Sequence, residues 1–210
     1  MTARQSDAIF AKIARRYDLL NAVLSLGQEQ NWRRRAVDYL PHGQLLDLGS
    51  GTGAAAPVFG SRDVVALDPV PQMLMLSPIG ARVVGCGEQL PFADESFDAV
   101  FSAYVFRNLD SVDQTLDEVA RVLRPGGAAA IVDLTRPNRP ASASIHRAGT
   151  AVVLPLAGRA VGAADEYRYL HESLDALPPP EEMYRNRRLR FERVWRMGPM
   201  GFVYGVILRK

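Results

Sequence analysis

The chain has 210 residues, of which 48% are hydrophobic and 23% charged, and its formal net charge is +2. This composition excludes an intrinsically disordered chain and allows one large domain with its own core, whereas so small a net charge neither implies nor excludes a nucleic-acid partner. The single cysteine, Cys86, excludes an internal disulfide and suits a reducing cytoplasm. No apolar run approaches eighteen residues, and residues 1–7 lack the apolar stretch of a signal peptide. We therefore expect neither a membrane-spanning helix nor a leader.

Two helices are predicted at the start of the chain. Apolar side chains at helical spacing indicate the first, at Phe10, Ile13, Tyr17 and Leu20. The second runs through Trp32 to Leu40 and ends before Pro41. We interpret this segment as a helical cap on a following sheet, in which Tyr17 and Asn21 serve either the site or the surface.

The most informative stretch is residues 44–53, QLLDLGSGTG. An apolar run predicts a buried strand, glycines at positions 49, 51 and 53 follow, and three alanines then favour a helix. A strand, a glycine turn and a helix N-terminus together present backbone N–H groups to a polar ligand. Two ligands fit: a dinucleotide, because Gly49-x-Gly51-x-x-Ala54 matches its fingerprint, and S-adenosylmethionine, whose loops carry such glycines after an acid like Asp47. A plain tight turn would also explain the glycines.

An acidic residue ends the next predicted strand. Residues 64–67 are apolar, and Asp68 follows them, 19 residues past Gly49. Because ligands in an open α/β sheet bind beyond the carboxyl ends of the strands, this carboxylate is placed to accept ribose hydroxyls of either cofactor. The alternative is that Asp68 caps a helix starting near Pro71.

The remaining elements complete an α/β pattern. Further strands are predicted at Val83–Val84, Phe97–Phe101 and Ala128–Leu134, and Ser111 is placed to cap a helix that contains residues 112–122. Strands that alternate with helices predict a parallel, doubly wound sheet. Two final strand-like runs, Phe191–Arg196 and Gly201–Leu208, predict a hairpin added to the far side of the sheet.

Several motifs then occur in a fixed order: Asp47-x-Gly49-x-Gly51-x-Gly53, Asp68, Leu90-Pro91-Phe92, Ser96-Phe97-Asp98 and Leu123-Arg124-Pro125-Gly126-Gly127. Together they resemble class I methyltransferases that use S-adenosyl-L-methionine. Four further segments, Tyr17–Asn21, Leu24–Gly27 with Trp32-Arg33, Phe106–Asn108 and Tyr167–Ser173, resemble the UbiE/MenG family. The resemblance implies a Rossmann-like, mostly parallel sheet with a C-terminal antiparallel hairpin and an N-terminal helical cap.

That resemblance also implies an organisation and a substrate. One methyltransferase domain would comprise a helical cap over the substrate site (1–42), a cofactor-binding core (43–135), a lid and substrate region (136–187) and the terminal hairpin (188–210). The family methylates a ring carbon of demethylmenaquinol or of a ubiquinone precursor. A lipophilic quinol substrate implies a cytoplasmic protein in peripheral contact with the inner face of the cell membrane. No nucleic-acid partner is expected, and a homodimer is left open.

The resemblance assigns roles to individual residues. The cofactor-binding set is Asp47, Gly49, Gly51, Thr52, Asp68, Cys86, Gly87 and Ala103, with no metal. Cys86 departs from the family, which usually has an acid or an amide beside the adenine. Arg107 would stabilise a phenolate, Asn108 would orient the quinol oxygen, and Tyr17 would pass the proton to solvent. The alternatives are a surface ion pair for Arg107 and a turn or cap for Asn108.

Three other functions stay open at this point. An NAD-dependent oxidoreductase would use the same glycine loop. A methyltransferase could act on another small molecule or on nucleic acid, although residues 103–106, AYVF, replace the Asn-Pro-Pro-Tyr element that methylates exocyclic amines. A binding module that has lost catalysis is the third, and Cys86 is the residue that favours it.

Overall fold

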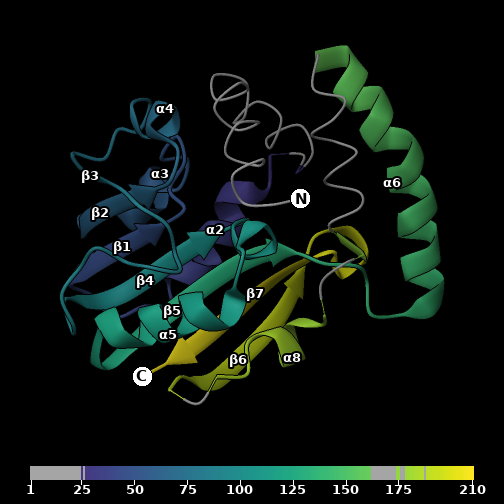
Figure 1. The fold of residues 1–210 in the computed structure, drawn as a ribbon. Coiled ribbons are helices and arrows are strands. Elements are labelled where there is room, and N and C mark those ends of the chain that lie inside the picture. The colour runs from purple at the N-terminus through teal and green to yellow at the C-terminus, as the bar shows by residue number, and fades with distance from the viewer. Residues whose placement is uncertain (1–24, 26, 162–173, 176–177, 187) are drawn as a thin grey trace.

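A seven-stranded sheet forms the centre of the protein (Figure 1). The computed structural model describes residues 25, 27–161, 174–175, 178–186 and 188–210. The strands, in sheet order, are β3 (Ala81–Val84), β2 (Asp63–Asp68), β1 (Gln44–Leu48), β4 (Phe97–Ala103), β5 (Leu123–Leu134), β7 (Val203–Arg209) and β6 (Arg190–Met197). The first five are parallel, and β7 runs antiparallel to both of its neighbours. The predicted doubly wound sheet with a terminal hairpin is confirmed.

The central strands are apolar because both of their faces are covered. Leu45, Leu46 and Leu48 on β1, and Phe101 on β4, are almost completely buried. Such continuous apolar runs are typical of parallel strands that are packed on both sides. The chain order along the sheet reverses between β1 and β4, so the loops after these two strands diverge and leave room for a ligand.

Helices cover both faces of the sheet. The helical elements are α2 (Glu29–Val37), α3 (Ala56–Phe59), α4 (Pro71–Leu74), α5 (Val112–Val122), α6 (Pro140–Val161), α8 (Pro180–Met183) and the 3₁₀ turns η1 (Phe106–Asn108) and η2 (Pro199–Gly201). In Figure 1, α5 and α8 lie in front of the sheet and α2 lies behind it. Trp32 and Phe59 belong to the apolar core on one face, and Leu116 and Tyr184 to the core on the other. The predicted cap of α5 is confirmed, because the Ser111 hydroxyl accepts the Gln114 N–H at 3.2 Å.

The helix after the glycine loop differs from the prediction. Residues 51–55 form turns, and α3 begins only at Ala56 and lasts four residues. Gly51 and Gly53 both have positive φ angles, and the Gly53 N–H donates to the Ser50 carbonyl, so the backbone keeps turning. The alanines at 54 and 55 therefore do not start a helix, despite their helical propensity, and this loop has no helix N-terminus of useful length.

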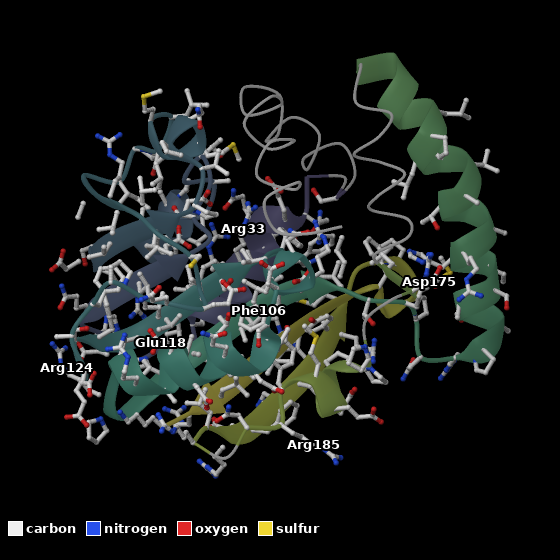
Figure 2. The ribbon with its side chains drawn as sticks, viewed as in Figure 1. Arg33, Phe106, Glu118, Arg124, Asp175 and Arg185 are labelled. Carbon is white, nitrogen blue, oxygen red and sulfur yellow. The ribbon has the colours of Figure 1, made fainter. Side chains whose placement is uncertain are left out.

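The long helix α6 lies to one side of the sheet, beyond the β6–β7 end (Figure 1). Asp175, labelled beside α6 in Figure 2, pairs with Arg136 before the helix and with Arg147 on it, at 2.9 and 2.8 Å. Within the described part of the chain, no helix is long and apolar enough to cross a membrane. The predicted first helix, with Tyr17, lies outside the described residues.

Candidate active site

The loops at the carboxyl ends of β1, β2 and β4 enclose a cavity, called the loop cavity below. Its wall includes every residue of the predicted cofactor-binding set: Asp47, Gly49, Gly51, Thr52, Asp68, Cys86, Gly87 and Ala103. Asn108 lies on the same wall, together with Arg33, Ser50, Tyr104 and Val105. The fold therefore brings together residues that are spread over more than fifty positions of the sequence.

Gly49 is the tightest point of the loop. Its φ angle is +70°, and a Cβ built there would lie 2.2 Å from Cγ2 of Val105. Val105 follows β4, so the loop after β1 packs directly against the loop after β4. Only glycine allows both the positive φ and this close approach.

The backbone N–H groups of the loop are directed into the protein, which corrects an expectation from the sequence. Gly49 and Ser50 donate to the Leu67 carbonyl at 2.8 and 2.9 Å, and Gly51 donates to Oδ2 of Asp68 at 2.8 Å. The other Asp68 oxygen accepts the Val70 N–H at 2.9 Å, while α4 has Val70 rather than Asp68 as its N-cap. Asp68 thus joins the loops that follow β1 and β2, and the three N–H groups are not presented to the cavity.

The loop cavity instead carries three buried polar side-chain atoms that lack partners among the described residues. They are Oδ2 of Asp47, Nε of Arg33 and Oγ of Ser50. Burial raises the pKa of Asp47 to about 7, and the nearby charge of Arg33 opposes that rise. A carboxylate acceptor and a guanidinium donor on one wall suit a ligand with an α-ammonium and an α-carboxylate group. S-adenosyl-L-methionine has both groups and NAD has neither, so this donor and acceptor pair fits the former.

Arg33 and its neighbours were missed by the sequence reasoning as site residues. Arg33, labelled on α2 in Figure 2, contacts Oε1 of Glu29 at 3.3 Å and lies 5.6 Å over the Tyr104 ring. The four-residue spacing of Glu29 and Arg33 on one helix was the available signal. Tyr104 is a non-glycine residue at φ +65°, held by an N–H donated to the Val132 carbonyl at 2.8 Å. Non-glycine residues with a strained backbone are often found at functional sites, but the amino-acid composition does not reveal where they lie.

A second cavity, called the apolar cavity below, has a volume of about 480 Å³ and lies between α2, α6 and η2. Most of its wall is apolar: Trp32, Leu134, Ile145, Val153, Leu154, Leu174, Met200 and Phe202. Glu29, Arg107 and His146 supply charge or polarity, and the His146 ring stacks on Phe202 with centroids 5.3 Å apart. Tyr104 lies on the walls of both cavities, so the two meet there.

Arg107 forms a buried ion pair and not the surface pair that was the alternative. Its Nη1 lies 3.1 Å from Oδ1 of Asp133, and the two side chains are 9% and 0% exposed. Burial raises the pKa of Asp133, and the Arg107 charge opposes this rise. Asp133 was missed, although an acid inside the apolar run of β5 was a signal. Arg107 lines the apolar cavity and Asn108 the loop cavity, so the two predicted catalytic residues serve different cavities, while Tyr17 lies outside the described residues.

In the described part of the chain, no group of three or more His, Cys, Asp or Glu side chains could hold a metal ion. Cys86 is an exposed thiol on the rim of the loop cavity. Gly87, the next residue, lines the same cavity, and the role of both residues beside the adenine stays a prediction.

Comparisons with known proteins agree with this geometry. The model of the ubiE/COQ5 methyltransferase family matches residues 1–187. Demethylmenaquinone methyltransferases of Thermus thermophilus and Deinococcus radiodurans are 38% and 40% identical, over 83% and 86% of this chain and 87% and 81% of theirs. A Thermotoga maritima structure is described as an S-adenosylmethionine-dependent methyltransferase, possible histamine N-methyltransferase. Its TM-score with this chain is 0.61 at 18% sequence identity, and the match covers 96% of this chain and 98% of that one, which shows a common fold. The chain therefore belongs to the ubiE/COQ5 methyltransferase family and is an S-adenosyl-L-methionine-dependent methyltransferase of the class I fold.

Proposed function

We propose that the protein methylates a ring carbon of a prenylated quinol such as demethylmenaquinol. The observation that carries this proposal is the apolar cavity of about 480 Å³, which meets the loop cavity at Tyr104. An aromatic ring with an isoprenoid tail needs an apolar wall of this kind, with a few polar groups to orient it. The names of the relatives from Thermus and Deinococcus support the same substrate class.

The loop cavity is the proposed cofactor site. Asp47 would bind the ammonium group and Arg33 the carboxylate of the methionine portion, and Gly49, Gly51 and Thr52 would line it. Asp68 would accept the ribose hydroxyls, and Cys86, Gly87 and Ala103 would border the adenosine. When bound, S-adenosyl-L-methionine supplies an electrophilic methyl group on a sulfonium sulfur. The protein's contribution is alignment, because an in-line displacement gains much of its rate from correct positioning.

Arg107 is proposed to activate the quinol. A quinol ring carbon becomes strongly nucleophilic when an attached hydroxyl loses its proton, so the site must favour the phenolate. A guanidinium that stays charged in an apolar cavity stabilises such an anion far more than it would in water. Asp133 holds this guanidinium at 3.1 Å. Asn108, whose amide donates to the Tyr104 carbonyl at 3.3 Å, would orient the quinol oxygen. Tyr17 keeps its predicted role in proton transfer.

We propose that residues 1–42 cap the substrate site and that residues 136–187, which include α6, form its outer wall. Ile145 and Val153 of α6 line the apolar cavity and are themselves 65% and 58% exposed. A lipophilic substrate could reach the cavity past such side chains from the surface of a bilayer, which supports the peripheral membrane contact.

Incubation with methyl-labelled cofactor and chemically reduced demethylmenaquinone tests the function. Label should appear in the quinone, and mass spectrometry should place it on the ring. Absence of label from the quinone, with label entering RNA or protein instead, would reject the proposal.

An arginine variant tests the proposed activation. Arg107→Ala should lower kcat at least about 100-fold, because a preorganised charge is typically worth that much, while S-adenosylhomocysteine affinity stays nearly unchanged. Arg190→Ala is the matched control and should keep its rate, because this arginine lies on β6 with its side chain 73% exposed. An unchanged rate in Arg107→Ala would remove this residue from the mechanism.

A further inference from the structure

Glu29 is a buried acid that the proposed mechanism does not yet use. It is the first residue of α2, and its side chain is only 9% exposed. Oε1 contacts Arg33, whereas Oε2 is buried and has no hydrogen-bond partner among the described residues. A buried acceptor without a partner is destabilising, so a ligand that donates a hydrogen bond there would be favoured.

The position of Glu29 points to the quinol rather than to the cofactor. Glu29 lies on the wall of the apolar cavity, whereas its partner Arg33 lies on the wall of the loop cavity. The pair therefore spans the junction of the two cavities, beside Tyr104. A substrate ring that reaches the junction would bring its hydroxyl to this carboxylate.

The groups around Glu29 include a cation that can stabilise the anion left on the quinol after proton transfer. The charged or titratable groups that share its cavity wall are Arg107 from η1, His146 from α6 and Tyr104, and Arg33 contacts it from its own helix. Arg33 keeps the carboxylate in place, and Arg107 can stabilise the phenolate that remains after the proton has left. A base and an anion-stabilising cation thus line one cavity.

We propose that Oε2 of Glu29 accepts the hydroxyl proton of the bound quinol, an inference that rests on the proposed function. The hydroxyl O–H bond breaks, its electron pair stays on oxygen, and Glu29 becomes neutral. The ring carbon then forms a bond to the methyl group as the carbon–sulfur bond breaks and its electrons stay on sulfur. The ring carbon loses its hydrogen as a proton to water, and the oxygen regains a proton from Glu29. The net change is one methyl group gained by the quinol and one proton released.

Kinetics of Glu29→Gln test this role, because glutamine keeps the size and loses the basicity. At saturating cofactor and pH 7, kcat on reduced demethylmenaquinone should fall about 100-fold or more, as is usual for loss of a general base. The deficit should shrink as pH rises toward the phenol pKa of about 10, since the quinol then ionises without help. Glu29→Asp should recover part of the rate, and Glu192→Gln, at an exposed ion pair on β6, should leave it unchanged.

A purely structural role would give different results. If Glu29 only positions Arg33, then Glu29→Gln would weaken S-adenosylhomocysteine binding and leave kcat at saturating cofactor near that of the wild type. That pair of results would overturn the proposal. Wild-type protein that methylates no quinol would instead show the proposed function to be wrong, so the two failures are distinguishable.

A binding measurement gives a second readout that needs no turnover. A nitronaphthol serves as probe, because its phenolate absorbs visible light and reports ionisation directly. With the Glu29 carboxylate in place, the cavity should bind the probe together with one proton, which Oε2 takes from the probe hydroxyl. Glu29→Gln removes the like charge and leaves two guanidinium groups nearby, so its affinity for the phenolate should rise. Equal loss of affinity for both forms, as expected for a collapsed cavity, would count against the proposal.

Discussion

Replacing Gly49 with alanine tests whether the loop after β1 is packed as closely as the structure indicates. Two costs are expected. A Cβ in the left-handed region costs about 1–2 kcal/mol. The new methyl would also lie 2.2 Å from Cγ2 and 3.0 Å from Cγ1 of Val105, and overpacking of this kind costs typically ~1–3 kcal/mol. The free energy of unfolding should therefore fall by about 2–5 kcal/mol.

Gly126→Ala is the matched control for the cost of a Cβ in the left-handed region. Its φ angle is +81°, and a Cβ there meets nothing within 4 Å, so the variant should lose only the left-handed part. Urea unfolding gives the free energy of unfolding of both variants. Calorimetric titration with S-adenosylhomocysteine should show weaker binding for Gly49→Ala alone, because Val105 would be pushed into the loop cavity. Adding Val105→Ala should restore stability to about that of Gly126→Ala. Equal stability of the two single variants, with unchanged binding, would refute the close packing.

Three further predictions concern buried polar groups. The hydroxyls of Tyr184 and Tyr204 are buried and 2.8 Å apart. Either single change to Phe should lower the free energy of unfolding in urea by about 1–3 kcal/mol, and the double change should lower it by less than the sum of the two. Additive losses would mean that the hydrogen bond contributes nothing. Because burial raises the pKa of Asp47 from 3.8 to about 7, the folded protein keeps a proton that the unfolded chain releases, and the free energy of unfolding should fall between about pH 4 and pH 7. Asp47→Asn should lessen that fall, and an identical slope would contradict the assignment. Asp133→Leu leaves the Arg107 guanidinium buried without its counter-charge and should cost about 3–5 kcal/mol by chemical unfolding, whereas a loss below ~1 kcal/mol would mean that the pair is solvated.

The fold was predictable because its signals are local. Continuous apolar runs predict buried parallel strands, and their alternation with helices predicts the doubly wound sheet. The ligand-binding edge followed from the glycines after β1 and the acid after β2, since carboxyl ends of parallel strands meet at one edge. The resemblance to a methyltransferase family named the cofactor-binding set, and all residues of this set lie on the wall of the loop cavity.

What the sequence could not give are contacts between distant segments. The loop N–H groups of Gly49 and Ser50 bond to Leu67 because β2 lies beside β1 at a particular register. Arg107 pairs with Asp133, 26 residues away, only because η1 follows β4 and β4 lies beside β5 in the sheet. Tyr104 lines both cavities, and its strained backbone conformation depends on tertiary structure, so the amino-acid composition does not reveal it. These contacts decide which polar atoms remain for a ligand.

A crystal structure with S-adenosylhomocysteine and a quinol analogue would locate both ligands. The nucleoside product should lie in the loop cavity, with its amino-acid group between Asp47 and Arg33, and the quinol ring should lie in the apolar cavity. The two ligands should meet at Tyr104, with a ring hydroxyl facing Glu29. Product bound away from the loop after β1, or a quinol ring outside the apolar cavity, would contradict the account.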